Sequence, residues 1–186
     1  MRGSRYNGGR EMRSTHCWEI LRRNISVVPL LEAGLRGKGW VASKPFTNTV
    51  NSMGGMTALG AMARYPQIHS IACMMGSGYF VQLSHTLFPP LVARTPEQKE
   101  TLAARLAPLA PYDPSQQLDK LANRPLLLWH GEADEVVPFA ETVRLEQALR
   151  DAQLDGNMTY LSEKQIGHKI TPSALIALVS FFKHHL

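Results

Sequence analysis

The chain has few cysteines and no long apolar run. Cys17 and Cys73 are the only two cysteines among 186 residues, and neither lies in a CxxC or another metal-ligand spacing. This scarcity excludes a disulfide scaffold, favours a reducing compartment and predicts no metal site. No segment approaches the ~18 consecutive apolar residues of a membrane span, and the N-terminal arginines precede no signal-peptide core. We therefore expect a cytoplasmic protein without a membrane partner.

An excess of positive charge occurs only at the front of the chain. Residues 1–44 hold nine Lys or Arg against three Glu, whereas the remainder is nearly neutral. A basic segment can bind nucleic acid or anionic membranes. Such a site needs stacking aromatics or a recognisable motif, and only Tyr6, Trp18 and Trp40 lie nearby. We favour a solvated, arginine-rich helix and expect no nucleic-acid partner, with a basic binding module as an alternative.

The composition and patterning predict one α/β domain over residues 1–186. Hydrophobic residues make up 44% of the chain, enough for a single sizeable core, and no internal repeat is present. Residues 1–10 are polar and glycine-rich, which predicts a loop. Helical spacing predicts helices over 12–33, 56–65, 97–107, 139–152 and 172–185. Short β-branched or apolar runs predict strands at 46–50, 68–75, 126–129 and 158–161. This alternation indicates a mostly parallel sheet with helices on both faces.

Two helices carry readable apolar positions. The first has Trp18, Ile20, Leu21, Ile25, Val28 and Leu31 at mostly helical spacing. Pro29 is expected to disturb that helix. The last helix is expected to bury Leu175, Leu178, Val179 and Phe182 on one face.

Residues 79–123 lack a strand pattern and contain several prolines around one helix. Long excursions between two strands of a compact domain are often lids or caps. We therefore expect this segment to form a small helical cap insertion.

Three strand ends supply the residue types of a catalytic triad. Ser52 follows the first strand, Asp134 follows the third, and His168 follows the fourth. Parallel sheets carry their working residues at the carboxyl ends of strands, and the order Ser…Asp…His is the one found in α/β-hydrolases. A serine hydroxyl needs a base such as histidine, and a buried carboxylate holds the imidazole in the right tautomer.

The turn after Ser52 also suits this chemistry. Gly54 and Gly55 permit a tight strand-to-helix turn that exposes the serine hydroxyl. The backbone N–H of Met53, at the start of the following helix, is expected to point at the developing oxyanion.

Each triad residue also has a simpler interpretation. Ser52 could be an ordinary helix N-cap, Asp134 could close a turn, and His168 could be an exposed loop histidine. The intervals between them leave room for the intervening strands, cap and helix, which favours the triad. His130, at the end of the third strand, is a candidate supporting residue.

The stretch from residue 52 to residue 186 closely resembles the small bacterial carboxylesterases of the α/β-hydrolase fold, relatives of dienelactone hydrolases and prolyl-oligopeptidase-type domains. The segments that carry the resemblance are 52–60, 74–80, 87–91, 125–131 with Asp134 and Val137-Pro138, and 168–172. The resemblance implies hydrolysis of short-chain esters of small molecules without a cofactor. The first cap residues, Tyr79, Phe80, Leu87 and Phe88, are then expected to line the substrate pocket. The oligomeric state is not predicted.

Two departures from this family bear on activity. Such esterases begin with several strands that this chain lacks. Those strands carry a His-Gly loop whose backbone N–H donates a second hydrogen bond to the oxyanion. The motif around the nucleophile is Val50-Asn51-Ser52-Met53-Gly54, with valine where the family has glycine, and a β-branched side chain is expected to crowd the turn. We therefore expect an N-terminally truncated, partial fold with an open sheet edge.

Four interpretations remain open from the sequence. The first is an active serine esterase, and the second is a remnant whose triad residues are present but unassembled. A prolyl-oligopeptidase-type peptidase is less favoured because no propeller or peptide-binding domain is visible. The basic binding module is the fourth.

Overall fold

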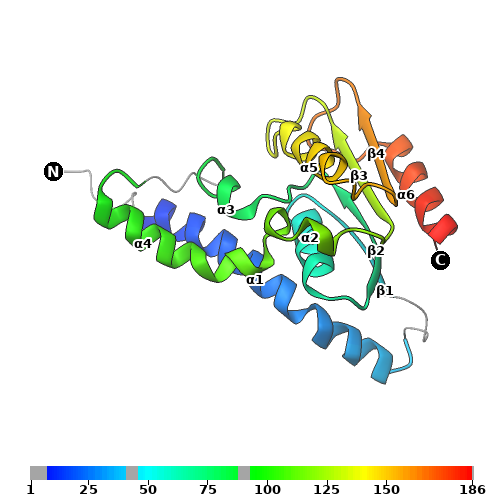
Figure 1. Ribbon diagram of the computed structural model, residues 1–186, viewed down its shortest axis with the longest axis horizontal. Helices are drawn as coiled ribbons and strands as arrows, with labels where there is room; N and C mark the ends of the chain where they lie inside the picture. Colours follow the sequence, from blue (N-terminus) through cyan, green and yellow to red (C-terminus); the bar gives the residue numbers. More distant parts are fainter. Residues whose placement is uncertain (1–7, 41–45, 88–92, 186) are drawn as a thin grey trace.

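Four parallel strands form the central sheet. The structure, a computed structural model, describes residues 8–40, 46–87 and 93–185 (Figure 1). In spatial order the strands are β1 (Phe46–Asn51), β2 (Ile68–Met74), β3 (Leu126–Gly131) and β4 (Met158–Glu163). Each pairs in parallel with the next. The predicted parallel α/β architecture is confirmed, and all four carboxyl ends lie at one edge of the sheet.

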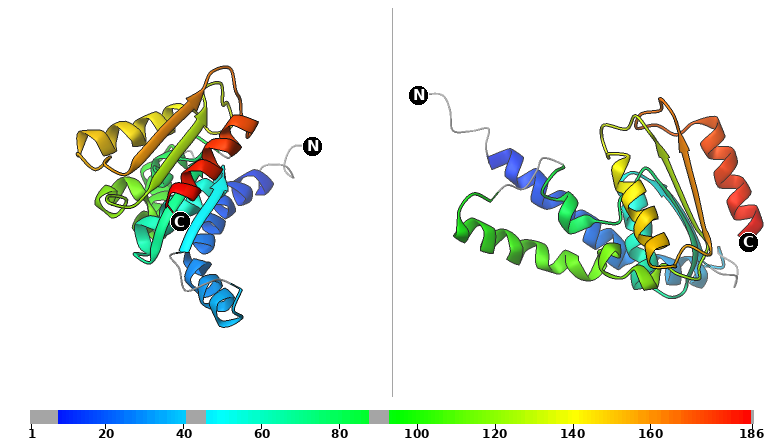
Figure 2. Two further views of the ribbon diagram at one scale, coloured as in Figure 1. Left: turned by 90° about the vertical axis from the view of Figure 1, so that its right-hand side faces the viewer. Right: turned by 45° about the horizontal axis from the view of Figure 1, so that its top comes forward.

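Helices cover the two faces of the sheet unequally (Figure 2). On one face lie α1 (Gly8–Gly37), α2 (Met53–Arg64) and α5 (Ala140–Asp151), which share the larger hydrophobic cluster. The other face carries α6 (Pro172–His185), which packs on β2 and β3 in a smaller cluster. β3 is buried along its whole length because both of its faces are covered.

The long first helix packs one stripe of side chains against α2. Trp18, Leu21, Ile25 and Val28 recur at helical spacing and are all buried. Helix α1 begins at Gly8, so the loop predicted for residues 1–10 is wrong over its last three residues. A helix that is already nucleated extends at little cost, and this explains the earlier start.

Pro29 does not interrupt α1, which continues to Gly37. A proline inside a helix removes one hydrogen bond and costs about 3 kcal/mol. Ile25 and Val28 are buried beside it, and each such side chain contributes roughly 1.5–3 kcal/mol, which offsets the loss. The expected disturbance at Pro29 is therefore wrong. Ile20 and Leu31, expected on the apolar stripe, are exposed instead.

Helix α6 is rotated relative to the predicted apolar face. Ala174 and Phe181 are buried and Leu178 and Phe182 pack beside them. Leu175 and Val179 are 51% and 52% exposed, so their predicted burial is wrong. The small Ala174 side chain lets the helix approach the sheet closely, with Phe181 covering the rest of the apolar surface.

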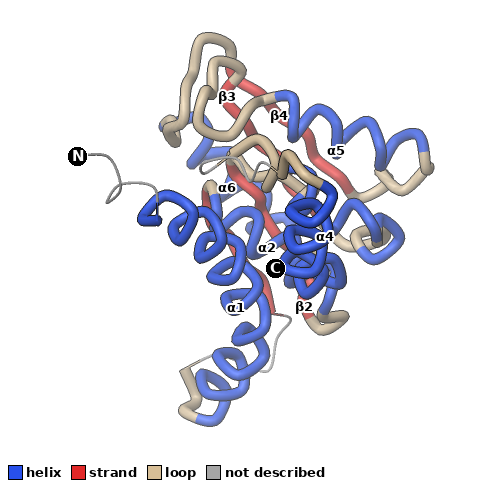
Figure 3. The backbone as a smooth tube through the Cα atoms, turned by 90° about the vertical axis from the view of Figure 1, so that its left-hand side faces the viewer, coloured by secondary structure: helices blue, strands red, loops and turns tan. Residues whose placement is uncertain are grey.

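The segment between β2 and β3 contains no strand within its described residues. It holds α3 (Phe80–Leu83), α4 (Pro96–Leu106) and the 3₁₀ turns η1 (Ala107–Tyr112), η2 (Pro114–Gln116) and η3 (Leu118–Lys120). Thr95 and Gln98 form a reciprocal capping box at the start of α4. Helix α4 extends away from the sheet, and it joins η1, which packs on α1 (Figures 1 and 3). This arrangement fits the predicted helical insertion, whose role as a cap stays a prediction.

Candidate active site

The three predicted triad residues follow three strand ends at the same edge of the sheet. Ser52 follows β1, Asp134 follows β3, and His168 follows β4. The loops that carry Asp134 and His168 come into direct contact, since Ala133 N donates to Ile166 O at 2.9 Å.

A glycine permits this loop contact. A Cβ atom on Gly131 would lie 2.4 Å from the carbonyl oxygen of Ile166 and 2.8 Å from that of Gly167. Any larger residue at the end of β3 would therefore push the two loops apart. The glycine of the His-Gly pair at residues 130–131 thus allows the loop that carries His168 to lie close to Asp134.

Asp134 and His168 form the hydrogen bond expected of a base and the group that orients it. His168 Nδ1 lies 2.7 Å from Asp134 Oδ2. The Asp134 side chain is fully buried, whereas His168 retains 22% exposure of its side chain. The carboxylate accepts the Nδ1 proton, which leaves Nε2 of the neutral ring as the basic nitrogen. The structure thus brings these two predicted residues together, and their catalytic role stays a prediction.

Hydrogen bonds keep Asp134 ionised despite its burial. Burial alone raises the pKa of its carboxyl, but the bond to His168 and the backbone N–H groups of Val136 and Val137 outweigh it, so the pKa lies below its ordinary value. Val136 N and Val137 N donate to Oδ1 at 2.8 and 3.0 Å. The other oxygen of Asp134, Oδ2, is left to face two histidines, His168 and His130.

His130 is a second, fully buried partner of Asp134. Its Nε2 lies 3.1 Å from Asp134 Oδ2 and 2.9 Å from the carbonyl oxygen of Val137. Both neighbours accept hydrogen bonds, so Nε2 carries the proton. Burial lowers the pKa of His130. Its Nδ1 lies 2.6 Å from the Thr142 hydroxyl, which donates to the carbonyl oxygen of Gly76 at 3.2 Å. The sequence indicated only that His130 supports the site, because its contact with Thr142 joins two separate elements.

The loop after His168 is held to β4 by a carboxylate. Glu163 Oε1 accepts hydrogen bonds from the Thr171 hydroxyl at 2.7 Å and from Trp129 Nε1 at 3.1 Å. The bond from Thr171 is the main cause that lowers the pKa of Glu163. Glu163 was not predictable from the sequence, because a Glu at the end of a strand carries no distinctive local signal.

Ser52 occupies a strained turn between β1 and α2. Its backbone has φ 55° and ψ −127°, a region that side-chain-bearing residues rarely adopt. Ser52 N donates to Met74 O at 2.8 Å, and Met56 N donates to Ser52 O at 3.1 Å. These bonds fix the turn from both sides. Strain of this kind at a nucleophile exposes its hydroxyl and is often stored at functional sites.

The crowding expected from Val50 is accommodated by Gly54. A Cβ atom on Gly54 would lie only 2.7 Å from the Cβ of Val50. The absence of a side chain at residue 54 therefore leaves the room that Val50 occupies. Val50 itself is 37% exposed, because no strand pairs with the outer edge of β1 in the described chain.

No hydrogen bond joins Ser52 to His168. Within residues 8–40, 46–87 and 93–185, the Ser52 hydroxyl has no hydrogen-bond partner, and the only side-chain partner of His168 is Asp134. The structure thus brings together two of the three predicted residues and leaves the third at the same sheet edge without contact. Catalytic hydrogen bonds are often long without substrate and tighten when it binds.

Met53 lies where the predicted oxyanion donor should be. It is the first residue of α2, so its backbone N–H has no intrahelical acceptor. Its sulfur lies 3.8 Å from Cys17 Sγ on α1. The Met53 side chain is thereby directed toward α1, and its backbone N–H remains at the sheet edge.

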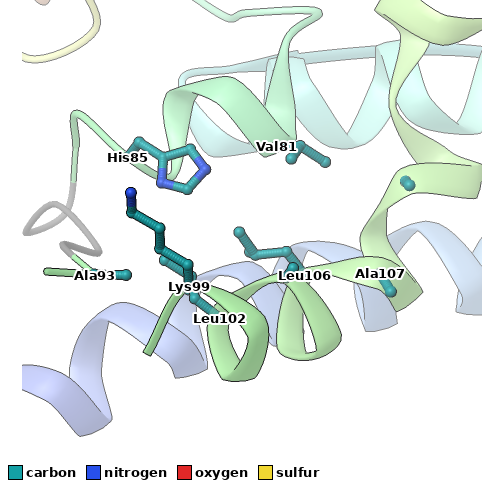
Figure 4. Close-up of a pocket in the computed structure, with 9 residues that line it drawn as sticks. Val81, His85, Ala93, Lys99, Leu102, Leu106 and Ala107 are labelled. Atoms are coloured by element: carbon teal, nitrogen blue, oxygen red, sulfur yellow. The ribbon is translucent and has the colours of Figure 1, made fainter. Parts of the chain in front are cut away.

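Three of the predicted pocket residues, Tyr79, Phe80 and Leu87, make other contacts in the structure. Tyr79 stacks on Arg144, with the guanidinium carbon 3.5 Å from the ring centroid. Phe80 is fully buried in the core, and Leu87 packs against that core. Phe88 lies outside the described residues. None of Tyr79, Phe80 and Leu87 lines the hollow between α3 and α4 (Figure 4).

The basic front segment is partly neutralised within α1. Arg22 and Arg23 pair with Glu19, and Arg36 pairs with Glu32. These i,i+3 and i,i+4 pairs are typical of a solvated helix surface. Across the described ranges, no group of three His, Cys, Asp or Glu side chains could hold a metal ion. In the same ranges no helix is both long and apolar enough to cross a bilayer.

A parallel sheet with helices on both faces, a strained serine after one strand and an Asp–His pair after two others define part of an α/β-hydrolase fold. TT1662 from Thermus thermophilus shares this fold, with a TM-score of 0.60 and 23% identity over 83% of this chain and 58% of that one. The chain belongs to the prolyl oligopeptidase family, whose profile matches residues 37–186.

Two curated relatives carry the name esterase. Esterase YjfP of Escherichia coli (strain K12) is 41% identical over 99% of this chain and 74% of its own length. Putative esterase YitV of Bacillus subtilis (strain 168) is 28% identical over 92% of this chain and 69% of its own length. By family and relationship the chain is a hydrolase of the esterase type. It spans about three quarters of YjfP and under two thirds of TT1662.

Proposed function

We propose that the chain is a serine hydrolase that cleaves short-chain carboxylic esters through Ser52, His168 and Asp134. The observation that carries the proposal is the 2.7 Å contact of His168 Nδ1 with the buried Asp134 carboxylate. The strained turn at Ser52 supports it independently. The names of the two curated relatives agree with an ester substrate.

In the proposed reaction His168 Nε2 takes the proton of Ser52 as Oγ attacks the ester carbonyl carbon. The carbonyl oxygen becomes an oxyanion, which accepts a hydrogen bond from Met53 N–H. The bond to the alkoxy group then breaks, and His168 returns the proton to the leaving alcohol. Water attacks the acyl-serine with His168 again as base, which releases the carboxylic acid and restores the Ser52 hydroxyl.

A catalytically impaired remnant is the second candidate. It is favoured by the absence of a hydrogen bond between Ser52 and His168, whose described side-chain partner is Asp134. This candidate therefore predicts a folded chain with unreactive Ser52.

A peptidase is the third candidate, and the family description favours it. The same triad can cleave amides, so the leaving group decides between the two activities. We expect turnover of p-nitrophenyl esters and none of prolyl p-nitroanilides. Amide turnover faster than ester turnover would establish the peptidase instead.

The test is reaction of the purified chain with a fluorophosphonate probe and with p-nitrophenyl acetate and octanoate. Labelling and turnover are expected in the wild-type chain and should vanish in Ser52→Ala. Ser26→Ala is the matched control, because the Ser26 hydroxyl bonds only to a carbonyl oxygen of its own helix. Asp134→Asn should lower kcat by roughly 10⁴-fold, since the imidazole loses its tautomer control.

Circular dichroism and a cooperative unfolding transition establish that each variant is folded. An unlabelled but folded wild-type chain would rule out the esterase and leave the remnant. Labelling that persists in Ser52→Ala would assign the nucleophile to another residue.

A further inference from the structure

The insertion between β2 and β3 contains a pocket outside the proposed active site. It has a volume of about 450 Å³, within the ~300–1,000 Å³ range of small-molecule sites. Its walls come from α3 with the turn that follows it, and from α4 with the start of η1 (Figure 4). The lining residues are Val81, His85, Ala93, Lys99, Leu102, Ala103, Leu106, Ala107 and Ala110.

The α4 wall is one face of that helix. Lys99, Leu102, Ala103 and Leu106 recur at intervals of three and four residues, so they point the same way. Alanines at this face keep the pocket open, because larger side chains would fill it. Lys99 and Leu106 are about 10 Å apart along the helix axis, roughly the length of an eight-carbon chain.

Polar groups in the pocket are confined to one end. Lys99 extends its ammonium group toward the imidazole of His85, while Val81 and Leu106 lie farther in (Figure 4). None of the described lining residues is acidic. Lys99 has no ion-pair partner among the described residues, so its charge is available to a ligand. The pocket therefore offers a positive mouth and an apolar interior.

We propose that this pocket binds a straight-chain aliphatic monocarboxylate. The carboxylate contacts Lys99, and the alkyl chain lies against Val81, Leu102 and Leu106. A carboxylate fits better than a phosphate, because the described lining residues include no arginine to engage phosphate oxygens in pairs. The site does not require Ser52 to be reactive, so it stands apart from the proposed hydrolytic activity.

The test is a titration of the Ser52→Ala chain with octanoate, followed by amide chemical shifts and by calorimetry. Using this variant separates the pocket from any occupation of the nucleophile. Saturable shifts are expected over residues 80–87 and 95–110. Butanoate should bind much more weakly, since each buried methylene contributes about fourfold in affinity.

Two variants and one control locate the site. Lys99→Met should weaken octanoate binding at least tenfold, and Ala103→Trp should block the pocket without changing its charge. Lys183→Met, on α6, is the matched control and should leave binding unchanged. Octanol and octyltrimethylammonium should bind far more weakly than octanoate.

Three results would overturn the proposal. The first is the absence of saturable shifts in these segments, and the second is equal affinity for octanol and octanoate. The third is tighter binding of octyl phosphate than of octanoate, which would assign the positive mouth to phosphate esters.

Discussion

At the scale of single residues, Asp134 connects the chemistry to the stability of the fold. Its carboxylate is buried and held ionised by His168 and two backbone N–H groups, which lower its pKa. A depressed folded-state pKa stabilises the native state above the ordinary value of about 3.9. That contribution is lost as the pH falls through the folded-state pKa.

The difference in stability between the wild-type chain and Asp134→Asn is therefore expected to shrink as the pH falls. The free energy of unfolding, measured by urea titration, should differ between the two proteins by a constant amount above about pH 5. The difference should shrink below about pH 4. Asp119→Asn, at an exposed position beside Lys120, should show almost no difference at any pH. A gap for Asp134→Asn that stays constant down to pH 3 would contradict this account.

His130 is expected to act as a positioning residue through Asp134. His130→Asn removes a donor to Asp134 Oδ2, and a hydrogen bond to a charged group is worth about 1.5–3 kcal/mol. We expect kcat for p-nitrophenyl acetate to fall at least tenfold with little change in KM. The acidic limb of the pH profile of kcat should also shift, because the carboxylate beside His168 is less well held.

A purely structural role for His130 would give a different result. The variant would then lower the melting temperature but leave kcat and its pH profile unchanged in the folded fraction. Thr142→Val is the matched milder variant, because it removes the partner of Nδ1 and the bond to the carbonyl oxygen of Gly76 but leaves the contact of His130 with Asp134.

At the scale of elements, the rotation of α6 about its axis determines which of its side chains belong to the smaller hydrophobic cluster, and this can be tested. Phe181→Ala should cost about 3 kcal/mol, because this side chain fills the space against β2 and β3. Val179→Ala, on the exposed side of the same helix, should change stability by less than ~0.5 kcal/mol. The two values come from chemical denaturation of otherwise identical chains. Similar losses of stability in both variants would support the apolar face that the sequence predicted.

The sequence predicts strands and helices better than it predicts which side of a helix is buried. The run at residues 126–129 is apolar and bounded by Pro125 and Gly131, so a buried strand follows from local pattern alone. On α6, however, apolar residues occur nearly all round, and the burial of Ala174 depends on fit against Trp129 and its neighbours. That fit is a tertiary property, which periodicity does not contain.

The same limit applies to the active site. The order and positions of Ser52, Asp134 and His168 follow from their places after strands. The contacts of His130 with Thr142 and of Glu163 with Thr171 depend on how separate elements pack. Pocket-lining residues are the least predictable, since Phe80 belongs to the predicted cap yet is buried in the core.

At the scale of the whole molecule, the outer edge of β1 is the part of the sheet that we expect to pair most readily with a second copy of the chain. Its sequence, Phe-Thr-Asn-Thr-Val-Asn, has no charged residue or proline, the features that protect natural sheet edges. Its last three residues are exposed. The opposite edge strand, β4, ends at a glutamate.

Thr49→Lys is expected to reduce association of the purified chain. Sedimentation velocity at rising concentration should show a smaller fraction of dimers and larger species than in wild type. Thr159→Lys, at an exposed position on β4, is the matched control and should have a weaker effect. An equal effect of both variants would indicate a general influence of charge rather than pairing at β1.

The length of α1 also sets the outline of the molecule. Its 30 residues span about 45 Å, whereas a six-residue strand spans about 20 Å, so the helix is more than twice as long as a strand of the sheet. A spherical protein of this size would have a radius of gyration near ~16 Å. Small-angle scattering should give a clearly larger value and a distance distribution with a long tail. A single helix therefore gives this chain an elongated hydrodynamic shape, although its sheet is small.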